Sequence, residues 1–534
     1  MAQTPDDLLD QSIEEAGEGA TVPHPPHARL ADKPLNRPLI TFSIMAATIM
    51  QALDSTIANV ALPQMQGSLS ATQDQMMWVL TSYIIAAAIM IPLTGWLAGR
   101  FGRKRVFLIS IVGFTVSSAL CGLSGNLAMI VLCRVLQGMS GAALVPLSQA
   151  VLFDINPPEH HGRAMSIWGV GVTLGPVLGP MLGGWLTENY SWNWVFFINV
   201  PVGIIAFVGL SASMPETVRQ PGRFDFFGFT SLALGIGALQ LFLDRGELKD
   251  WFSSPEIIAE ALLAGLAMYS FLVHSLTHPR PFLSLALFAD RNFVTANVFI
   301  FMIGVILFAT LALIPPMLQN ELAYPVIASG MVTAPRGAGT MLGMMVVGRM
   351  IGRIDARWIV GLGLMLMLVS LWQMMDFNLL MSEEPIVVSG ILQGFGIGLA
   401  YVPISTVAFA TLPTSLRNEG TAFFNLQRNI GSAIGISAVQ TLLTRNTQTV
   451  HAGLASHFAP WHHPALALAA SHIATVSPGG WLALDHMITR EATMIAYLDD
   501  FKLMFILTLL LLPTLVLLRP PARSQAKAEL AVME

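Results

Sequence analysis

Residues 171–184 read "GVTLGPVLGPMLGG" and lie inside an apolar segment, where a buried helix would ordinarily carry leucine and alanine. Four of the glycines follow one another at a spacing of four residues: Gly171, Gly175, Gly179 and Gly183. At this spacing each glycine advances only about 40° around a helix, so the four predict one shallow groove against which another backbone can pack. Pro176 and Pro180 each remove a hydrogen-bond donor, at about 3 kcal/mol each in water, a loss that neighbouring groups in a helix bundle reduce. The stretch predicts a membrane-embedded helix in close contact with a partner.

Composition supports this class of protein. Of the 534 residues, 54% are hydrophobic and 11% are charged, and the mean hydropathy is +0.65; a typical soluble chain carries about 25% charged residues. Apolar runs of about 20 residues, the length with which one helix crosses the hydrocarbon, recur along almost the whole chain. The net charge of −5 and the lack of interleaved basic and aromatic residues argue against a nucleic-acid partner. No nucleophile and base pair, phosphate-binding loop or metal spacing indicates an enzyme, a cofactor or a metal site.

The apolar runs predict an all-α polytopic membrane protein with fourteen transmembrane helices. The expected spans cover residues 39–63, 77–99, 105–125, 127–150, 164–186, 194–213, 227–243, 257–277, 292–316, 328–350, 357–375, 385–410, 420–441 and 501–518. Most of the 27 Lys and Arg residues then fall on one side of the membrane, which predicts that both termini are cytoplasmic. The asymmetry also supports the number of spans, because one missed helix would place every later loop on the opposite side of the membrane and remove the charge bias.

Two parts of the chain resemble each other. "RVLQGMSGA" at 134–142 is echoed by "GILQGFGIGLA" at 390–400, and each is followed by a short loop that contains Pro and Arg and opens a helix of small residues. Internal repeats of this kind build a central site between two bundles in transporters. The expected order is therefore six plus two plus six helices in two pseudo-symmetric bundles.

Domain boundaries follow from this order. They are a disordered cytoplasmic tail at 1–38, an N-terminal six-helix bundle at 39–213, a cytoplasmic linker and two additional helices at 214–291, a C-terminal six-helix bundle at 292–518, and a cytoplasmic tail at 519–534. The C-terminal bundle includes a long periplasmic loop at 442–500. That loop holds half of the 12 histidines, His451, His457, His462, His463, His472 and His486. Their irregular intervals favour an ordinary polar loop over a metal site.

Asp54, within "LDSTIANVALP", is the candidate proton carrier. An acid inside the bilayer is costly and is by default a functional candidate. Arg134 lies at nearly the same depth as Asp54, judged by about 1.5 Å of rise per residue from the outer edge of each span, so the two side chains are expected to pair. Such a pair would either couple proton movement to transport or only hold the two helices together.

Five polar residues are candidates for the substrate cavity: Gln51, Asn59, Gln137, Arg336 and Arg428. The expected spans contain one deep acid, Asp54, against three deep arginines. An interior that is positive when Asp54 is protonated favours neutral or weakly acidic amphiphiles over multiply charged cations. Alternatively, backbone carbonyls occupy Arg336 and Arg428.

The loop between the second and third spans is the candidate gate. It lies in "GWLAGRFGRKRVF" at 95–107, and the residues expected to form the contact are Gly95, Arg100, Gly102, Arg103 and Lys104. Glycine permits a tight turn between two helices. The ordinary excess of positive charge on the cytoplasmic side would also explain the Lys and Arg residues.

These stretches together resemble the major facilitator superfamily, and within it the fourteen-span drug:proton antiporters of the EmrB/QacA type. "LDSTIANVALP", "GWLAGRFGRKR", "RVLQGMSGAA", "GVTLGPVLGPMLGG" and "WNWVFFINVPVG" are similar to motifs of that group, in order and on the right helices. One departure is Gly99, where the loop motif usually has an acid, so gating is expected to rest on the Arg and Lys residues and on Asp154 or Glu159. The resemblance implies alternating access between the bundles, with inward proton movement driving export.

The leading hypothesis is a proton-coupled secondary antiporter in the inner (plasma) membrane that exports amphiphilic, neutral or weakly acidic small molecules, as in multidrug efflux. Export of an endogenous metabolite, lipid or siderophore stays open, and symport or a non-transporting sensor or assembly subunit is less favoured. The resemblance also implies a periplasmic adaptor and an outer-membrane channel in an organism with two membranes. It assigns the glycine groove to a seam with the other half, at the tenth span with Gly339 and Gly343.

Overall fold

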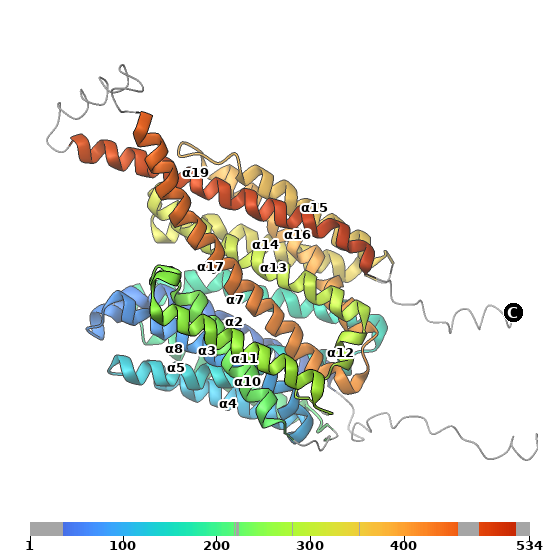
Figure 1. The fold of residues 1–534 in the computed structure, drawn as a ribbon. Helices are drawn as coiled ribbons and strands as arrows, with labels where there is room; N and C mark the ends of the chain where they lie inside the picture. The colour runs from blue at the N-terminus through green and yellow to red at the C-terminus, as the bar shows by residue number, and fades with distance from the viewer. Residues whose placement is uncertain are drawn as a thin grey trace, which may run out of the picture.

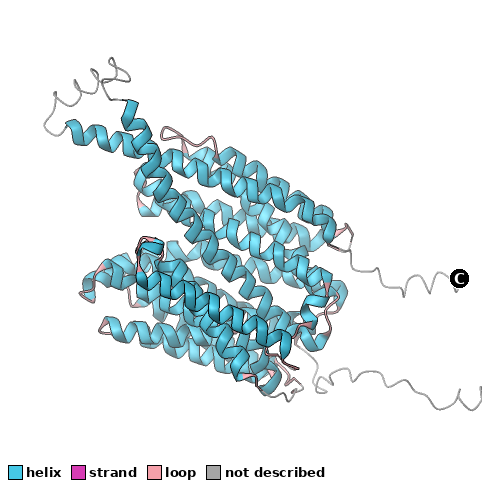
Figure 2. Ribbon diagram, in the orientation of Figure 1, coloured by secondary structure: helices cyan, strands magenta, loops and turns pink. Residues whose placement is uncertain are grey.

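A computed structural model of the chain describes residues 36–217, 219, 224–279, 281–351, 353–457 and 480–518. Within these ranges the regular structure is helical, apart from one isolated bridge between Ile351 and Ile354 (Figure 2). The all-α prediction is confirmed. The expected tails at 1–38 and 519–534 lie outside the described residues, except for positions 36–38.

The N-terminal bundle occupies the lower part of Figure 1. Its helices are α2 (Arg37–Ser68), α3 (Gln73–Phe101), α4 (Arg103–Gly122), α5 (Leu127–Gly141), α6 (Leu144–Ile155), α7 (His161–Asn189), α8 (Trp194–Phe197) and α9 (Asn199–Ser213). Polar side chains begin several of them, because the first backbone N–H groups of a helix have no partner within it. Thr72 and Gln75 form a reciprocal capping box at α3, and Asn126 caps α5.

Two further helices, α10 (Phe226–Arg245) and α11 (Pro255–Thr277), lie between the bundles in the chain. The C-terminal bundle follows in the upper part of Figure 1. It comprises α12 (Ala286–Ala289), α13 (Arg291–Pro316), α14 (Val326–Met350), α15 (Ala356–Met374), α16 (Glu383–Ala410), α17 (Arg417–His457) and α19 (Gly480–Leu511). The division into six, two and six membrane-spanning helices stays a prediction.

Within the described residues, twelve helices are long and apolar enough to cross a membrane. The other two expected spans correspond to α14 and α17, which are equally long but more polar, because α14 carries Arg336 and Arg349 and α17 carries Asn425 and Arg428. Both pack within the C-terminal bundle (Figure 1). Their crossing of the membrane stays a prediction.

The segment expected to be a loop at 442–500 is helical at both ends. α17 continues to His457, and α19 begins at Gly480. His451 Nε2 and Asp485 Oδ1 lie 3.1 Å apart and join the two extensions. His462, His463 and His472 lie outside the described residues. Among the described residues, no group of three or more His, Cys, Asp or Glu side chains could hold a metal ion.

The glycine groove of α7 packs against α2, within its own bundle. A Cβ added at Gly175 would lie 2.5 Å from the Ala52 carbonyl carbon, and one at Gly183 would lie 3.0 Å from Ile57 Cγ1. The Thr56 hydroxyl of α2 donates to the Gly175 carbonyl at 3.3 Å. The prediction that the opposite half fills this groove is wrong. The glycines predict that a backbone packs closely against α7, but they do not determine which helix supplies that backbone.

A different face of α7 meets α14. A Cβ on Gly169 would meet Met344, one on Gly337 would meet Val177, and the Ser166 hydroxyl donates to the Met344 carbonyl. Gly339 and Gly343, the expected partners of the groove, instead pack on α16 against the carbonyls of Ile391 and Phe395. α7 therefore joins the halves through this second face.

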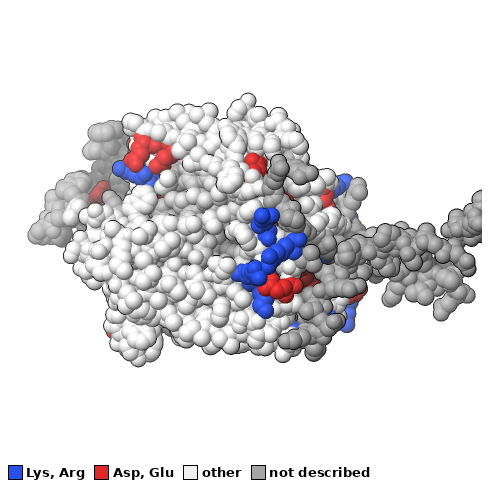
Figure 3. Space-filling model, turned by 90° about the horizontal axis from the view of Figure 1, so that it is seen from below, with Lys and Arg blue, Asp and Glu red and all other residues white. Residues whose placement is uncertain are grey.

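Both ends of the described chain lie at one end of the bundle, which we call the terminal end. Leu39 near the start of α2 packs by Gly209 near the end of α9, and Leu515 packs on Gly361 near the start of α15. The terminal end is at the right of Figure 1. On the face in Figure 3, charged side chains gather in a few groups and the remaining surface is uncharged, as a lipid-facing surface requires.

Candidate functional site

Asp54 is the centre of a buried polar cluster in the N-terminal bundle. Its Oδ2 accepts from Arg134 Nη1 at 2.7 Å, and its Oδ1 accepts from Gln137 Nε2 and from Asn199 Nδ2, both at 2.8 Å. Asp54 is 0% exposed and Arg134 is 1% exposed. The expected pairing of Asp54 with Arg134 is present, and the carboxylate is fully desolvated.

Arg134 is held by groups other than the acid. Its Nε donates to the Val79 carbonyl at 3.0 Å, and its Nη1 also donates to Gln137 Oε1 at 2.8 Å. The guanidinium lies 4.1 Å from the centre of the Tyr83 ring. Planar stacking and a fixed fork of donors keep an arginine oriented. Arg134 is therefore oriented by Val79 and Tyr83 of α3 and by Gln137 of its own helix, in addition to Asp54.

Asn199 is a site residue that sequence reasoning missed. It begins α9, is 1% exposed, and uses its amide nitrogen to donate both to Asp54 and to Ser118 Oγ at 2.9 Å. The available signal was a single amide within the apolar run "VFFINVPVG". A buried amide needs partners, but nothing in the sequence places this one beside Asp54.

The C-terminal bundle carries an uncharged version of this cluster. In the repeated stretch, Gly390 stands where Arg134 stands and Gln393 where Gln137 stands. Gln393 Nε2 donates to Thr310 Oγ1 of α13 at 3.2 Å, and both residues are fully buried. α13 is the first long helix of the C-terminal bundle, as α2 is of the N-terminal bundle. Thr310 of α13 therefore contacts Gln393 as Asp54 of α2 contacts Gln137. The ionisable version of the cluster belongs to the N-terminal bundle.

The candidate cavity residues are distributed over several environments. Gln137 belongs to the Asp54 cluster, Gln51 Nε2 donates to the Tyr83 hydroxyl at 3.2 Å, and Asn59 is exposed. Arg336 is 6% exposed and donates through Nη2 to the Leu307 carbonyl at 3.2 Å, while its Nε has no partner among the described residues. Arg428 lies beside Tyr401. A backbone carbonyl therefore binds one nitrogen of the Arg336 guanidinium, as the alternative predicts, and leaves its Nε without a partner among the described residues.

Asp500 is a second buried acid, and it lies in α19. The helix runs through this position without a break, because α19 extends from Gly480 to Leu511. Asp500 is 1% exposed, and neither carboxylate oxygen has a hydrogen-bond partner within the described ranges. Tyr497 lies near both Asp500 and Glu321. The described residues thus include two fully buried acids with contrasting surroundings.

Charged and polar contacts join the two halves at the terminal end. Asp154, at the end of α6, forms ion pairs with Arg103 of α4 and with Arg417 of α17, the latter at 3.3 Å. Arg103 Nε also donates to Asn418 Oδ1 of α17 at 2.6 Å. Deeper in, Gln149 of α6 accepts from Asn425 Nδ2 of α17 at 2.7 Å. The halves are therefore closed against each other at this end.

Residues of the candidate gate have different places in this contact. Gly95 packs on α17, where an added Cβ would lie 3.0 Å from Glu419 Cα, and Gly102 has φ +92°, a conformation that favours glycine. Lys104 Nζ donates to the Ser211 carbonyl within its own half, and Arg100 is exposed. Arg103 and Gly95 are thus the members that touch the other half.

Two related helix bundles, joined by a polar contact layer and with one ionisable cluster in the first bundle, have the architecture of a membrane transporter. The chain belongs to the Major Facilitator Superfamily, whose family model matches residues 44–435. It is a multi-span membrane protein and not an enzyme, as the sequence predicts.

Curated relatives cover most of the chain. It is 36% identical over 430 residues to the multidrug export protein EmrB of Haemophilus influenzae, covering 79% of this chain and 84% of that protein. It is 34% identical over 490 residues to EmrB of Escherichia coli K12, covering 90% and 95%. It is 34% identical over 492 residues to the fatty acid resistance protein FarB of Neisseria gonorrhoeae, covering 91% and 96%. The resemblance to EmrB-type proteins is confirmed.

Solved structures share the fold. The human organic anion transporter MFSD10 superposes with a TM-score of 0.57 at 15% identity, covering 89% of this chain and all 100% of that one. The proton:xylose symporter XylE superposes with a TM-score of 0.56 at 13% identity, covering 88% and 94%. At these identities the matches support the two-bundle architecture alone.

Proposed function

We propose that the chain is a proton-coupled antiporter that exports amphiphilic, neutral or weakly acidic small molecules. The observation that carries the proposal is the buried Asp54, whose carboxylate is bound by Arg134, Gln137 and Asn199. A carboxyl group in such a place is the one group of the cluster that can gain and lose a proton readily. The multidrug export relatives support the direction of transport.

Protonation of Asp54 would change the forces between helices. The ionised carboxylate joins α2 to α5 and α9 through three charge-assisted hydrogen bonds. A proton removes the charge that attracts Arg134 and converts one acceptor oxygen into a donor. The three helices are then free to rearrange, so proton binding and substrate binding become coupled through the conformation of one bundle.

Closure at the terminal end belongs to the same cycle. We assign the terminal end to the cytoplasm, on the basis of the Lys and Arg distribution along the sequence. The contacts of Asp154 with Arg103 and Arg417 then form the cytoplasmic gate in its closed state. Asp154 supplies the acid that the loop lacks at Gly99. Opening the gate exposes the path to substrate from the cytoplasm or the inner leaflet.

Substrate charge is the finer part of the proposal. Arg336 in the C-terminal bundle is buried and forms no ion pair among the described residues, so it offers an attraction for a weakly acidic group. The name of FarB, a fatty acid resistance protein, favours the same chemistry. Export of an endogenous metabolite, lipid or siderophore is the second candidate. A location in the inner membrane and a periplasmic adaptor with an outer-membrane channel complete the proposal, as EmrB-type exporters imply.

Transport by the purified chain in proteoliposomes tests the proposal. A pH gradient should drive accumulation of a lipophilic weak acid in the wild type, and Asp54→Asn should abolish the response to the gradient. Glu188→Gln, which neutralises an exposed acid at the end of α7, is the matched control and should transport normally. Fully gradient-dependent transport by Asp54→Asn would exclude Asp54 as the proton carrier.

A further inference from the structure

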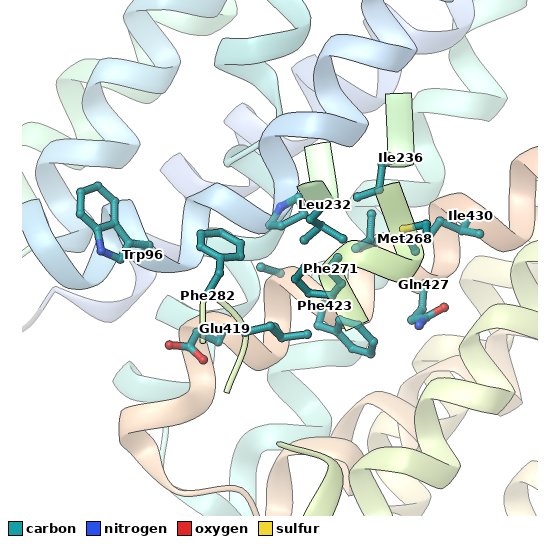
Figure 4. A pocket seen from close by; sticks show the side chains of 14 residues that line it. Trp96, Leu232, Ile236, Met268, Phe271, Phe282, Glu419, Phe423, Gln427 and Ile430 are labelled. Carbon is teal, nitrogen blue, oxygen red and sulfur yellow. The ribbon is translucent and has the colours of Figure 1, made fainter. Parts of the chain in front are cut away.

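A cavity lies where α10 and α11 cover the junction between α3 and α17. Its wall includes Trp96 of α3, Ile236 of α10, Met268 of α11, and Glu419 and Gln427 of α17 (Figure 4). The cavity volume is about 80 Å³. One water needs roughly 10–15 Å³ on the same scale, so the cavity is large enough for a small organic group.

The cavity is apolar except for three groups. Glu419 forms no ion pair within the described part of the chain, and its Oε2 accepts a hydrogen bond of 3.3 Å from the Ser284 N–H. Trp96 Nε1 is buried and has no hydrogen-bond partner among the described residues. Gln427 supplies an amide. The lining therefore offers an uncompensated carboxylate, an unused donor and a wide hydrocarbon surface, which together match a ligand and not a packed core.

Two of the three polar groups, Trp96 and Glu419, lie toward one end of the cavity. Trp96 is five residues before the end of α3, or about 8 Å from the terminal end, and Glu419 is in the first turn of α17. Ile430 lies eleven residues further along α17, about 16 Å deeper into the bundle. Figure 4 shows Trp96 and Glu419 on one side of the lining and Gln427 and Ile430 on the other. A ligand with a polar head and an extended apolar chain fits this order.

The α7–α14 and α3–α17 junctions between the halves differ in whether a cavity lies beside them. At the α7–α14 junction, glycines bring the helices into direct contact, as at Gly169 with Met344 and at Gly337 with Val177. At the α3–α17 junction, Gly95 brings the two backbones into contact near Glu419, and the additional helices α10 and α11 line the cavity beside this contact. The two additional helices thus form a wall of the cavity.

We propose that this cavity is a lateral binding site for an amphiphile of the bilayer that carries an ammonium head and an apolar tail. The ammonium group would pair with Glu419, an acceptor atom beside it would receive the Trp96 N–H, and the tail would lie against Ile236 and Met268. The proposal goes beyond the export function, since it needs neither proton coupling nor the central cavity. A free lipophilic amine and an aminophospholipid share the required chemistry.

Binding of dodecylamine to the full chain in phosphatidylcholine nanodiscs tests the site, with protein-free nanodiscs as the background. Dodecanol and dodecanoate have the same chain without the ammonium group and should bind at least about tenfold more weakly, the factor expected for one lost charge-assisted hydrogen bond. Glu419→Gln should weaken dodecylamine binding by a similar factor. Ile236→Trp, which fills the cavity from the lipid-facing wall, should weaken all three ligands.

Control variants show whether dodecylamine binds in this cavity or elsewhere on the chain. Glu188→Gln should bind dodecylamine as the wild type does, and weak-acid transport by the wild type reports the proposed export function independently. Unchanged dodecylamine binding in both Glu419→Gln and Ile236→Trp would overturn the proposal and leave export untouched. Phosphatidylethanolamine added to the nanodiscs distinguishes the sources: competition with dodecylamine supports an aminophospholipid at the site, and absence of competition supports a free amine.

Discussion

Asn199 of α9 donates a hydrogen bond of 2.8 Å to Asp54 of α2, across a separation of 145 residues. The same amide nitrogen donates to Ser118 of α4, so one side chain connects three helices at the ionisable group. The acid–arginine pair alone would connect α2 only to α5. Asn199 therefore links the carboxyl group of Asp54 to α4 and α9, in addition to its link with α5.

Replacing Asn199 should change the pH dependence of transport. In Asn199→Leu the carboxylate loses one of its three donors, so the pH profile of transport should shift and the maximal rate should fall several-fold. Asn199→Asp would place a second acid beside the first and should be more damaging. Proteoliposome transport over a pH series checks both. A profile that keeps its midpoint in Asn199→Leu would assign Asn199 to packing alone.

Neutralising Asp154 should open the terminal end. Asp154→Asn removes the shared partner of Arg103 and Arg417 and leaves two cations facing each other, a change of about 1–3 kcal/mol for partly buried charged groups. The population open at the terminal end should rise by about tenfold or more. Distances between spin labels on exposed positions of the two halves measure the change. Glu159→Gln, at a nearby exposed acid, should leave the distances unchanged.

Gly175→Leu should disturb the proton site through α2. The added side chain meets the backbone of Ala52 and Leu53, directly before Asp54, so α2 must move away from α7. We expect insertion into the membrane with loss of most proton-coupled transport. Gly184→Leu is the matched control, because a Cβ at Gly184 meets no atom within 4 Å. Normal coupling in Gly175→Leu would limit the groove to a packing role.

The sequence was sufficient for the helix order and for one pair of site residues. Apolar runs of membrane length predict the spans, and a common depth from the span edges predicts the pairing of Asp54 with Arg134. Glycines at a spacing of four also predict a close helix contact. They do not say which helix makes it, and the groove faces α2 because the glycine face of α7 turns inward within its own half.

Two site residues could not be found in the same way. Asn199 is a neutral amide in an apolar run, and its role follows only from the approach of α9 to α2. The sequence predicts a loop at Asp500 because the polar residues before it lower the local hydropathy. In the folded chain α19 is helical through that region, and the acid lies buried in the helix. Contacts between helices that are distant in the sequence determine the surroundings of both Asn199 and Asp500.

Asp225 should make the docking of α10 and α11 sensitive to acid. It lies before α10, where burial alone would raise its pKa, but hydrogen bonds from the Gly228 N–H, His274 and the Phe282 N–H hold the pKa below its usual range. A lowered pKa in the folded state contributes stability above the unfolded value, and this contribution is lost as pH falls through the folded value. Asp225→Ala should cost about 1 kcal/mol at neutral pH, as for loss of a helix cap. Hydrogen exchange in α10 measures the docking, and the difference between wild type and variant should shrink below about pH 4.

Asp500→Asn should stabilise the protein and slow transport. A buried carboxyl group without partners is costly, and the neutral amide is less so, which predicts a thermal midpoint higher by a few degrees. An acid kept in such a place despite its cost is a functional candidate, so the transport rate should fall several-fold. Asp499→Asn is the matched control, because Asp499 is exposed beside Asp500 on the same helix, and it should change neither quantity. A stabilised Asp500→Asn variant with the wild-type transport rate at every pH would show that transport does not use this carboxyl group.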